Sequence, residues 1–326
     1  MKRTIPLFII GFLFCFLLLF PRETLESSQT GILLWFNSLL PTLLPFLIVS
    51  QLLLKTSLVD SFLKILSPAF RRIFHCSDNG IFCMICGFLC GYPVGARLIA
   101  LQIQDGKLTL REGQYLLSFC NNVSPVFCIS YGILYGIGST KTFAYLFSIY
   151  GSALLFGILT RPKQAFPLCG DAKKQTSSTE TIFQLIDVCI IDSFFILIKL
   201  CGYLVLFSIL SSAILWISPD CPDILRIALT SLLEITKGLS LISTLPAGSL
   251  RSFLGVFALS FGGLCCLMQT HSVISGTGLS LQRYFFHKLL ISVLSLLLFF
   301  LWSFLFSVNS WSQLLTVFGN HFIITV

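Results

Sequence analysis

Long apolar runs, separated by short polar segments, fill most of this 326-residue chain. Runs of about 18 residues or more predict helices that cross a membrane rather than core helices of a soluble domain. We expect spans over 5–20, 31–54, 113–136, 142–159, 200–217, 252–270 and 285–307. The pattern therefore predicts an all-α polytopic membrane protein.

Two further apolar stretches, 80–104 and 224–245, are interrupted by residues that weaken a helix. The first contains GFLCGYPVGAR at 87–97, with three glycines and a proline, and the second contains EITKG at 234–238. Backbone freed from helical hydrogen bonds is tolerated at membrane depth only where it is buried in protein or lines a wet cavity. We expect a re-entrant hairpin at each stretch; for the glycines alone, a packing kink is the alternative.

Composition and charge support the membrane class. Hydrophobic residues make up 56% of the chain and charged residues 10%, whereas about a quarter of a soluble domain is charged. The net charge of +8 comes from basic residues placed singly or in pairs between apolar runs, without a basic face for nucleic acid. The 13 cysteines lie mostly within apolar runs, which indicates small hydrophobic residues rather than a disulfide framework.

The distribution of lysine and arginine predicts the sidedness. If 80–104 returns to the side from which it enters, Lys107, Arg111 and the basic loop after 160 all stay in the cytoplasm. The second hairpin then enters from outside, after the polar segment 218–223. Because Asp187, Asp192 and Lys199 interrupt 181–199, we expect an interfacial amphipathic helix there.

The N-terminus has the layout of a secretory signal, with Met1, Lys2 and Arg3 before an apolar run. No small-residue cleavage site follows this run. We favour an uncleaved span with a cytoplasmic N-terminus, and cleavage remains the alternative.

The two halves resemble one another. Gly95 and Gly238 lie 143 residues apart, and the Leu-Ser-Phe triplets at 117–119 and 259–261 lie 142 apart. We expect two inverted repeats, each with a re-entrant hairpin and broken transmembrane helices. The expected division is an N-terminal signal-anchor span (1–30), a first, Gate-like repeat (31–160), a cytoplasmic linker (161–180), a second repeat (181–308) and a C-terminal tail (309–326).

Interruptions at matching positions of two halves are the best sequence indication of a transporter's substrate site. Amides and hydroxyls beside Pro125 add polar groups to the first broken span, although such groups also join helices in membranes. The expected substrate-binding residues are Gly91, Tyr92, Pro93, Gly95, Arg97, Asn121, Asn122, Ser124, Thr236, Lys237, Gly238, Gly262, Gly263 and Gln269.

Charged residues within membrane-embedded hairpins are energetically costly, so each must have a partner, a ligand or access to water. Arg97 needs an anion, a partner or a route to the interface, so snorkelling and substrate contact both stay open. Glu234 lies three residues before Lys237, so the two can neutralise each other on one helix face. We favour Glu234 as the ion-coupling residue, for a proton or sodium, over a structural ion pair.

Motifs typical of enzymes and metal sites are incomplete. Cys83 and Cys86 have C-x-x-C spacing but no second pair, and the segment 136–142 lacks the Gly-Lys pair of a phosphate loop. His271 and His287 have no serine or carboxylate constellation. We therefore expect no enzyme activity, no catalytic residues, no metal and no cofactor.

Four motifs in order resemble a known family: GYPVGA within 87–97, LSFCNNVSPVF at 117–127, LLEITKGL at 232–239 and SFGG at 260–263, followed by Gln269. They are similar to bacterial sporulation integral membrane proteins of the YlbJ type. That family carries the nucleoside-recognition Gate domain, which is related to part of the concentrative nucleoside transporters. The resemblance covers about 32–290. It implies a multi-pass inner-membrane protein that moves dipicolinate toward the developing spore.

The expected function is transport of a small anionic or heteroaromatic molecule across the bacterial inner membrane. Arg97 or Lys237 and free helix N-termini would bind its negative groups, and Asn121 and Asn122 its ring polar atoms. The alternatives are a nucleoside transporter and a non-transporting scaffold or assembly factor in sporulation or envelope biogenesis. The expected partners are the substrate, a coupling proton or sodium and the lipid bilayer, with homo-oligomerisation left open.

Overall fold

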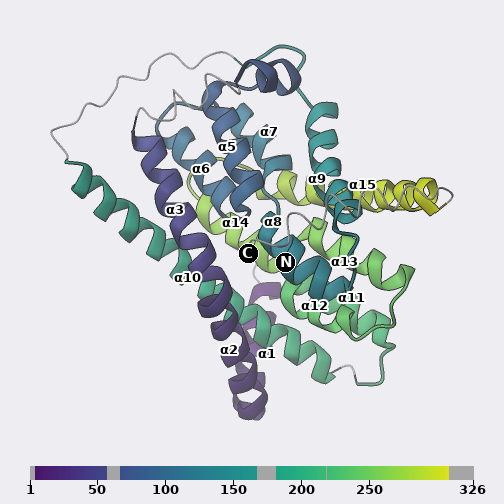
Figure 1. Ribbon diagram of the computed structural model, residues 1–326. Coiled ribbons are helices and arrows are strands. Elements are labelled where there is room, and N and C mark those ends of the chain that lie inside the picture. Colours follow the sequence, from purple (N-terminus) through teal and green to yellow (C-terminus); the bar gives the residue numbers. More distant parts are fainter. Residues whose placement is uncertain (1–3, 57–66, 167–180, 218, 308–326) are drawn as a thin grey trace.

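The computed structural model describes residues 4–56, 67–166, 181–217 and 219–307, and all regular structure in this part of the chain is helical (Figure 1). Six of these helices are long and apolar enough to cross a membrane. They are Pro21–Lys55, Leu110–Ile137, Thr142–Leu159, Ile182–Ile217, Ser249–Ile274 and Leu281–Phe306. The prediction of an all-α polytopic membrane protein is therefore confirmed. The C-terminal tail and most of the linker lie outside the described residues.

The first half begins with α1 (Thr4–Leu19) and a long helical run. Its consecutive parts are α2 (Pro21–Leu34), the π-helical turn η1 (Trp35–Leu39) and α3 (Leu40–Lys55). The loop expected before residue 31 is therefore wrong, because 23–29 is helical. Pro21 starts this helix at the position where the missing N–H of proline has little cost. Hydroxyls of Ser27, Ser28 and Thr30 donate to carbonyls four residues earlier, which lets these polar residues remain in a helix.

The rest of the first half is a hairpin, a broken helix and a straight helix. The hairpin consists of α5 (Asp78–Cys90) and α6 (Val94–Gln104), and a helix Ser67–Phe74 meets α5 at 92°. The broken helix consists of α7 (Leu110–Cys120), α8 (Pro125–Phe127) and η2 (Cys128–Ile137), and α9 (Thr142–Leu159) follows.

The second half repeats this order of elements. It begins with the long helix α10 (Ile182–Ile217), followed by the hairpin of α11 (Asp223–Leu233) and α12 (Ile235–Ser243). The broken helix is α13 (Ser249–Phe261) with α14 (Gly263–Ile274), and the straight helix is α15 (Leu281–Ser307). The opposite orientation of the two halves across a membrane remains a prediction.

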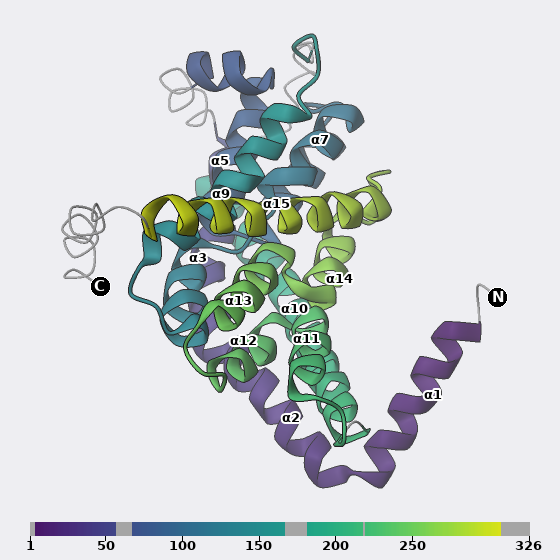
Figure 2. The ribbon, with the colours of Figure 1, turned by 90° about the vertical axis from the view of Figure 1, so that its right-hand side faces the viewer.

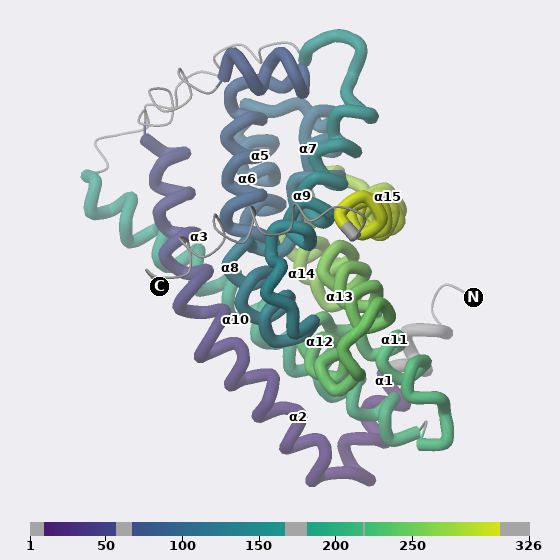
Figure 3. Tube along the Cα trace, turned by 45° about the vertical axis from the view of Figure 1, so that its right-hand side comes forward, coloured from purple at the N-terminus to yellow at the C-terminus, as the bar shows by residue number. Residues whose placement is uncertain are grey.

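Helix α10 differs from the sequence expectation. The interfacial helix and the span expected over 181–217 form one continuous helix of 36 residues. It runs beside α2 and α3 (Figure 3). Trp35 Nε1 donates to Leu197 O at 2.8 Å, and Gln51 Nε2 donates to Ser193 Oγ at 3.1 Å. These bonds tie the middle of α10 to η1 and α3, and 182–217 continues as one helix instead of turning along an interface.

Each hairpin is closed by a glycine in its second arm. A Cβ on Gly95 would lie 2.7 Å from Cα of Gly87, and one on Gly238 would lie 2.4 Å from Cα of Ser231. Both distances are too short for any side chain. Gly95 and Gly238 therefore allow the two arms of their hairpins to touch, which is the role that glycine has where backbones approach closely.

Two groups of helices lie above and below α15. In Figure 2 the first hairpin, α7 and α9 lie on one side of α15, and α11, α12 and α13 lie on the other. Loops from both halves meet at each end of the molecule. At one end His75 Nδ1 and Pro162 O are 2.8 Å apart, and Gln114 Nε2 donates to Ser280 O at 3.3 Å. At the other end Arg251 Nε donates to Gly136 O at 3.1 Å.

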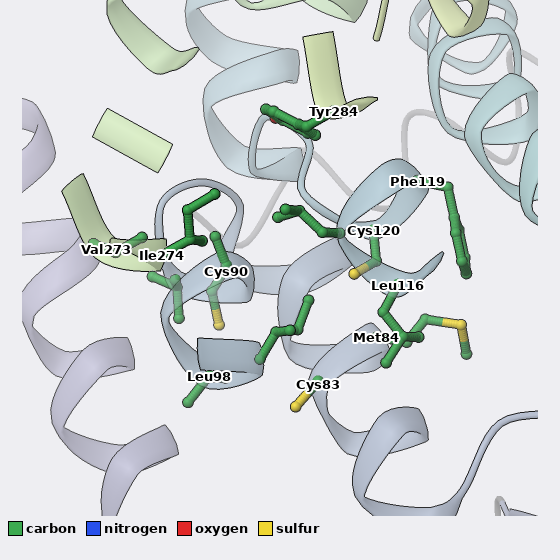
Figure 4. Packing of buried hydrophobic residues seen from close by; sticks show 14 of the residues in the cluster. Cys83, Met84, Cys90, Leu98, Leu116, Phe119, Cys120, Val273, Ile274 and Tyr284 are labelled. Atoms are coloured by element: carbon green, nitrogen blue, oxygen red, sulfur yellow. The ribbon is translucent and has the colours of Figure 1, made fainter. Parts of the chain in front are cut away.

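The largest hydrophobic cluster surrounds the first hairpin. Figure 4 shows Cys83, Leu98 and Leu116 from its arms and α7 packed with Val273 and Ile274 of α14. This packing places the turn of the hairpin against the second half of the chain.

Candidate functional site

The turn of the first hairpin lies against the break of the first broken helix. Tyr92 N donates to Asn122 O at 2.8 Å. A Cβ on Gly91 would lie 2.5 Å from Ser124 N, so only glycine fits there. Gly91 also has a φ of 78°, in the left-handed region that favours glycine. The residues that break the two elements therefore form one contact.

The second hairpin meets the second break in the same way. A Cβ on Gly263 would lie 3.2 Å from Leu233 O, at the end of the first arm of that hairpin. One on Gly262 would lie 3.1 Å from Tyr92 Oη, which belongs to the first hairpin. Tyr92 thus joins the two sets, and we call the place where both hairpin turns and both helix breaks meet the centre.

Glu234 forms the turn of the second hairpin and caps its second arm. Its carboxylate accepts hydrogen bonds from Thr236 N at 3.0 Å, from Lys237 N at 2.7 Å and from the Thr236 hydroxyl. The side chain is 1% exposed. A carboxylate at a helix N-terminus is stabilised by the free N–H groups and by the helix dipole. A buried acid is thus held at the centre with its charge compensated by backbone.

Lys237 does not pair with Glu234 through its side chain. Its ammonium group donates to Ser208 O at 3.3 Å and to the Ser212 hydroxyl, both on α10. The two charged side chains therefore have separate partners on different elements. The two side chains form no hydrogen-bonded ion pair within the described residues, and the coupling role of Glu234 remains a prediction.

The first break is tied to α15 by a buried polar network. Asn121 Nδ2 donates to Thr270 Oγ1 at 3.0 Å and to Tyr284 Oη at 2.9 Å, and Tyr284 Oη donates to Asn121 O at 3.2 Å. Lys288 Nζ donates to Asn122 Oδ1 at 3.1 Å and to Asn121 O at 3.5 Å. Asn121 Oδ1 is buried and has no hydrogen-bond partner among the described residues.

A small cleft lies beside the centre, with an interior volume of about 10 Å³, which is the room for one water molecule. It is lined by Pro93 from the first hairpin turn, by α10 and by α14. Its polar groups are Lys199, Tyr203, Gln269 and Ser272. The cleft therefore brings a cation, a phenol, an amide and a hydroxyl together within a largely apolar wall, and it would have to widen to admit a small organic molecule.

Arg97 lies on α6, past the turn of the first hairpin, and is half-buried. It is in electrostatic contact with Asp192 of α10. Its Nε has no hydrogen-bond partner in the described part of the chain. No ion pair joins Arg97 to Asp192 in the described part of the chain, so snorkelling and substrate contact both remain predictions for Arg97.

The structure brings most of the predicted site residues together. The centre contains Gly91, Tyr92, Asn121, Asn122, Ser124, Glu234, Thr236, Gly262 and Gly263. Pro93 and Gln269 line the cleft, while Gly95 and Gly238 close the hairpin arms and Arg97 and Lys237 face α10. Their roles in binding a substrate remain predictions.

Sequence reasoning missed five residues at this site: Lys199, Tyr203, Ser272, Tyr284 and Lys288. Lys288 lies near the start of the expected span 285–307, where a lysine commonly marks the membrane surface, but it is 1% exposed at the centre. The polar residues 284, 288, 292 and 295 recur at helical spacing in an otherwise apolar segment. That stripe was the signal, because it places them on one face of the helix.

Comparisons with known proteins agree with the motifs. Residues 36–152 match the family model for nucleoside recognition called Gate, and this range includes the first hairpin and the first break. The chain is similar to the sporulation integral membrane protein YlbJ of Bacillus subtilis (strain 168), with 25% identity over 309 aligned positions that cover 83% of this chain and 75% of that protein. No solved structure matches. The predicted resemblance is confirmed: part of the chain matches the Gate family model, and the chain is similar to YlbJ over most of its length.

Proposed function

We propose that this protein is a membrane carrier for a small anionic heteroaromatic molecule. The observation that carries the proposal is the meeting of two hairpin turns and two helix breaks beside a cleft. Discontinuous helices in transporters place free backbone groups and charges at a substrate site near the midplane of the membrane. Such an arrangement also lets the site open to either side when one half moves against the other.

The chemistry of the cleft suggests the class of cargo. The Lys199 ammonium at its edge would bind a carboxylate or another anion, and the Tyr203 ring would stack on a flat ring. Gln269 and Ser272 would bond the polar atoms of that ring. A pyridine dicarboxylate such as dipicolinate combines these features. The name of the relative places that protein in sporulation, and we propose the same setting here.

A nucleoside is the second candidate cargo, and the Gate match favours it. A nucleobase would use the same ring and amide contacts, but it would leave Lys199 without an anionic partner. A role as a membrane scaffold is the competing class of function. It requires no ligand in the cleft and no movement of solute.

Exchange of labelled solute in proteoliposomes tests the proposal. Dipicolinate, a benzene dicarboxylate and several nucleosides would each be measured with the wild type and with Lys199→Met. We expect saturable exchange of an aromatic dicarboxylate, and a loss of about tenfold or more in apparent affinity in Lys199→Met, because a charged hydrogen bond is removed. Lys141→Met, at an exposed position away from the cleft, is the matched control. Nucleoside exchange unaffected by Lys199→Met would support the second candidate, and no exchange of any solute would support the scaffold.

A further inference from the structure

Lys288 is a buried lysine without an acidic partner. It lies on α15 and is 1% exposed. Within the described ranges its ammonium nitrogen forms hydrogen bonds to oxygens of Asn121 and Asn122 and forms no ion pair. A lysine inside a membrane protein is costly, by about 2.5 to 3.5 kcal/mol on insertion scales, and is a functional residue by default. Its position therefore calls for a specific role.

The oxygens around Lys288 resemble those of a cation site. Helix α7 ends at Cys120, so the backbone carbonyl of Asn121 lies just past a helix C-terminus, where the helix dipole favours positive charge. The second oxygen is the neutral amide oxygen of Asn122. Carbonyls of unwound segments and C-terminal ends of half-helices are the groups with which transporters coordinate sodium ions. Here a lysine ammonium lies among such groups.

The fold does not need a lysine to form a helix break. The second break, at Gly262 and Gly263, forms with two residues in the left-handed region, at φ 84° and 81°. The offset of 142 to 143 residues between the halves places Tyr145 and Leu146 of α9 at the position that matches Lys288. The second break therefore has no lysine counterpart on that helix. The first break therefore has a lysine charge that the second break does not have on the matching helix.

The other residues around Lys288 provide no acidic group that bonds to its ammonium. Tyr284 lies one turn earlier on the same face of α15 and is bonded to Asn121. The thiols of Cys120 and Cys266 are in electrostatic contact with the ammonium. The Glu234 carboxylate is occupied by its own capping bonds. The ammonium is thus held by neutral oxygens.

We propose that the Lys288 ammonium is a resident cation that fills a carbonyl-lined cation site at the first helix break, in the place where a sodium ion would otherwise bind. The site would then bind no sodium in the wild type. Removal of the side chain would leave an empty site able to bind a small external cation. On the proposed carrier function, transport would not require sodium, and Glu234 would be the residue that couples to protons.

Thermal unfolding of the purified protein in detergent tests this proposal without a transport assay. We expect the melting temperature of the wild type to be the same in sodium chloride and in choline chloride. Lys288→Ala should melt roughly 5 °C or more below the wild type in choline, because the oxygens lose their cation, and sodium or propylammonium should restore most of the loss. Propanol, the neutral analogue of propylammonium, should not restore it.

Two further variants keep the test decisive if Lys288→Ala does not fold. Lys288→Gln keeps a hydrogen-bond donor but no charge, and Lys288→Arg keeps the charge. We expect the glutamine variant to be destabilised and to respond to sodium, and the arginine variant to respond to neither cation. Tyr284→Phe, which alters the same network without a change in charge, is the matched control and should not respond to sodium.

Three results would overturn the proposal. One is a wild type that sodium stabilises, because the lysine would then not fill the cation site. The second is a glutamine variant as stable as the wild type, because a hydrogen bond would then be enough. The third is a destabilised Lys288→Ala or Lys288→Gln that no cation restores. Since these readouts are melting temperatures, a failure to find any transported solute would leave them intact and would count against the carrier function alone.

Discussion

The ammonium nitrogen of Lys288 lies 3.1 Å from the side-chain oxygen of Asn122. Helix α15 of the second half therefore bonds to the helix break of the first half. Tyr92 makes the reciprocal contact, since this residue of the first hairpin lies against the glycine break of the second half. Each half therefore supplies a residue that completes the break of the other. Movement of one half against the other must change both contacts together.

The first prediction concerns the glycines that close the hairpins. Gly95→Ala and Gly238→Ala should each destabilise the protein by about 1 to 3 kcal/mol, because the added methyl group would meet backbone at 2.7 Å and 2.4 Å. Gly202→Ala on α10 is the matched control, since no atom lies within 4 Å of its Cβ position. Thermal unfolding in detergent measures the effect. Equal melting temperatures for all three variants would show that the arms are not in contact.

The second prediction concerns Glu234. Glu234→Gln keeps an oxygen for one capping bond but removes the charge, so uptake driven by an ion gradient should fall by about tenfold or more. Exchange without a gradient should survive. The loss in stability should be about 1 kcal/mol, the contribution of a charge at a helix N-terminus. Proteoliposomes with and without an imposed pH or sodium gradient would measure both kinds of transport.

The control for Glu234→Gln is a double variant that also carries Lys237→Met. Because the Lys237 ammonium hydrogen-bonds to α10 and acts on Glu234 only through its charge, Lys237→Met should not restore the stability that Glu234→Gln loses. Recovery of stability in the double variant would indicate a structural ion pair. Full gradient-driven transport by Glu234→Gln would remove the coupling role.

The third prediction concerns sidedness. Reporters at Cys76 and Gly106 should both indicate the cytoplasm, and reporters at Asp220 and Gly248 should both indicate the outside. In the fold, His75 lies beside Pro162 and Arg251 bonds to Gly136, so the residues before α5 group with those after α9, and the start of α13 groups with the end of η2. Accessibility of introduced cysteines in intact cells would measure it. Opposite locations within either pair would contradict the re-entrant hairpins and the inverted repeat.

Much of the fold was predictable from local pattern. Glycine and proline at 87–97 predicted the first hairpin turn, and the expected helix 142–159 agrees with α9. These features depend on backbone chemistry and on apolar run length, which are readable along the chain. The continuous helix α10 was not predictable in this way. Its polar residues suggested an interface, and the bonds that hold Ser193 and Leu197 reach residues 142 and 162 positions away in sequence.

The site was predictable in part for the same reason. The breaks themselves are local, so Asn121, Asn122 and Glu234 could be chosen from sequence. The residues that face the breaks come from other helices. Lys288 lies near the start of an expected span, and Lys199 was assigned to an interfacial amphipathic helix. The burial of Lys288 at the centre depends on the packing of α15, and the position of Lys199 in the cleft depends on the packing of α10. That packing follows from tertiary contacts, which no single segment encodes.

Labelling of a cysteine in the cleft tests the central claim most directly. In a chain whose 13 cysteines are replaced by alanine, Ser272→Cys would be exposed to a membrane-impermeant maleimide with and without the exchanged solute. Ile198→Cys, on the exposed outer face of α10, is the matched control that should react slowly because it faces lipid. We predict reaction at position 272 and a slowing of about tenfold at saturating solute, because the solute occupies the cleft. A position 272 that never reacts, or that reacts equally fast with the solute bound, would contradict the account.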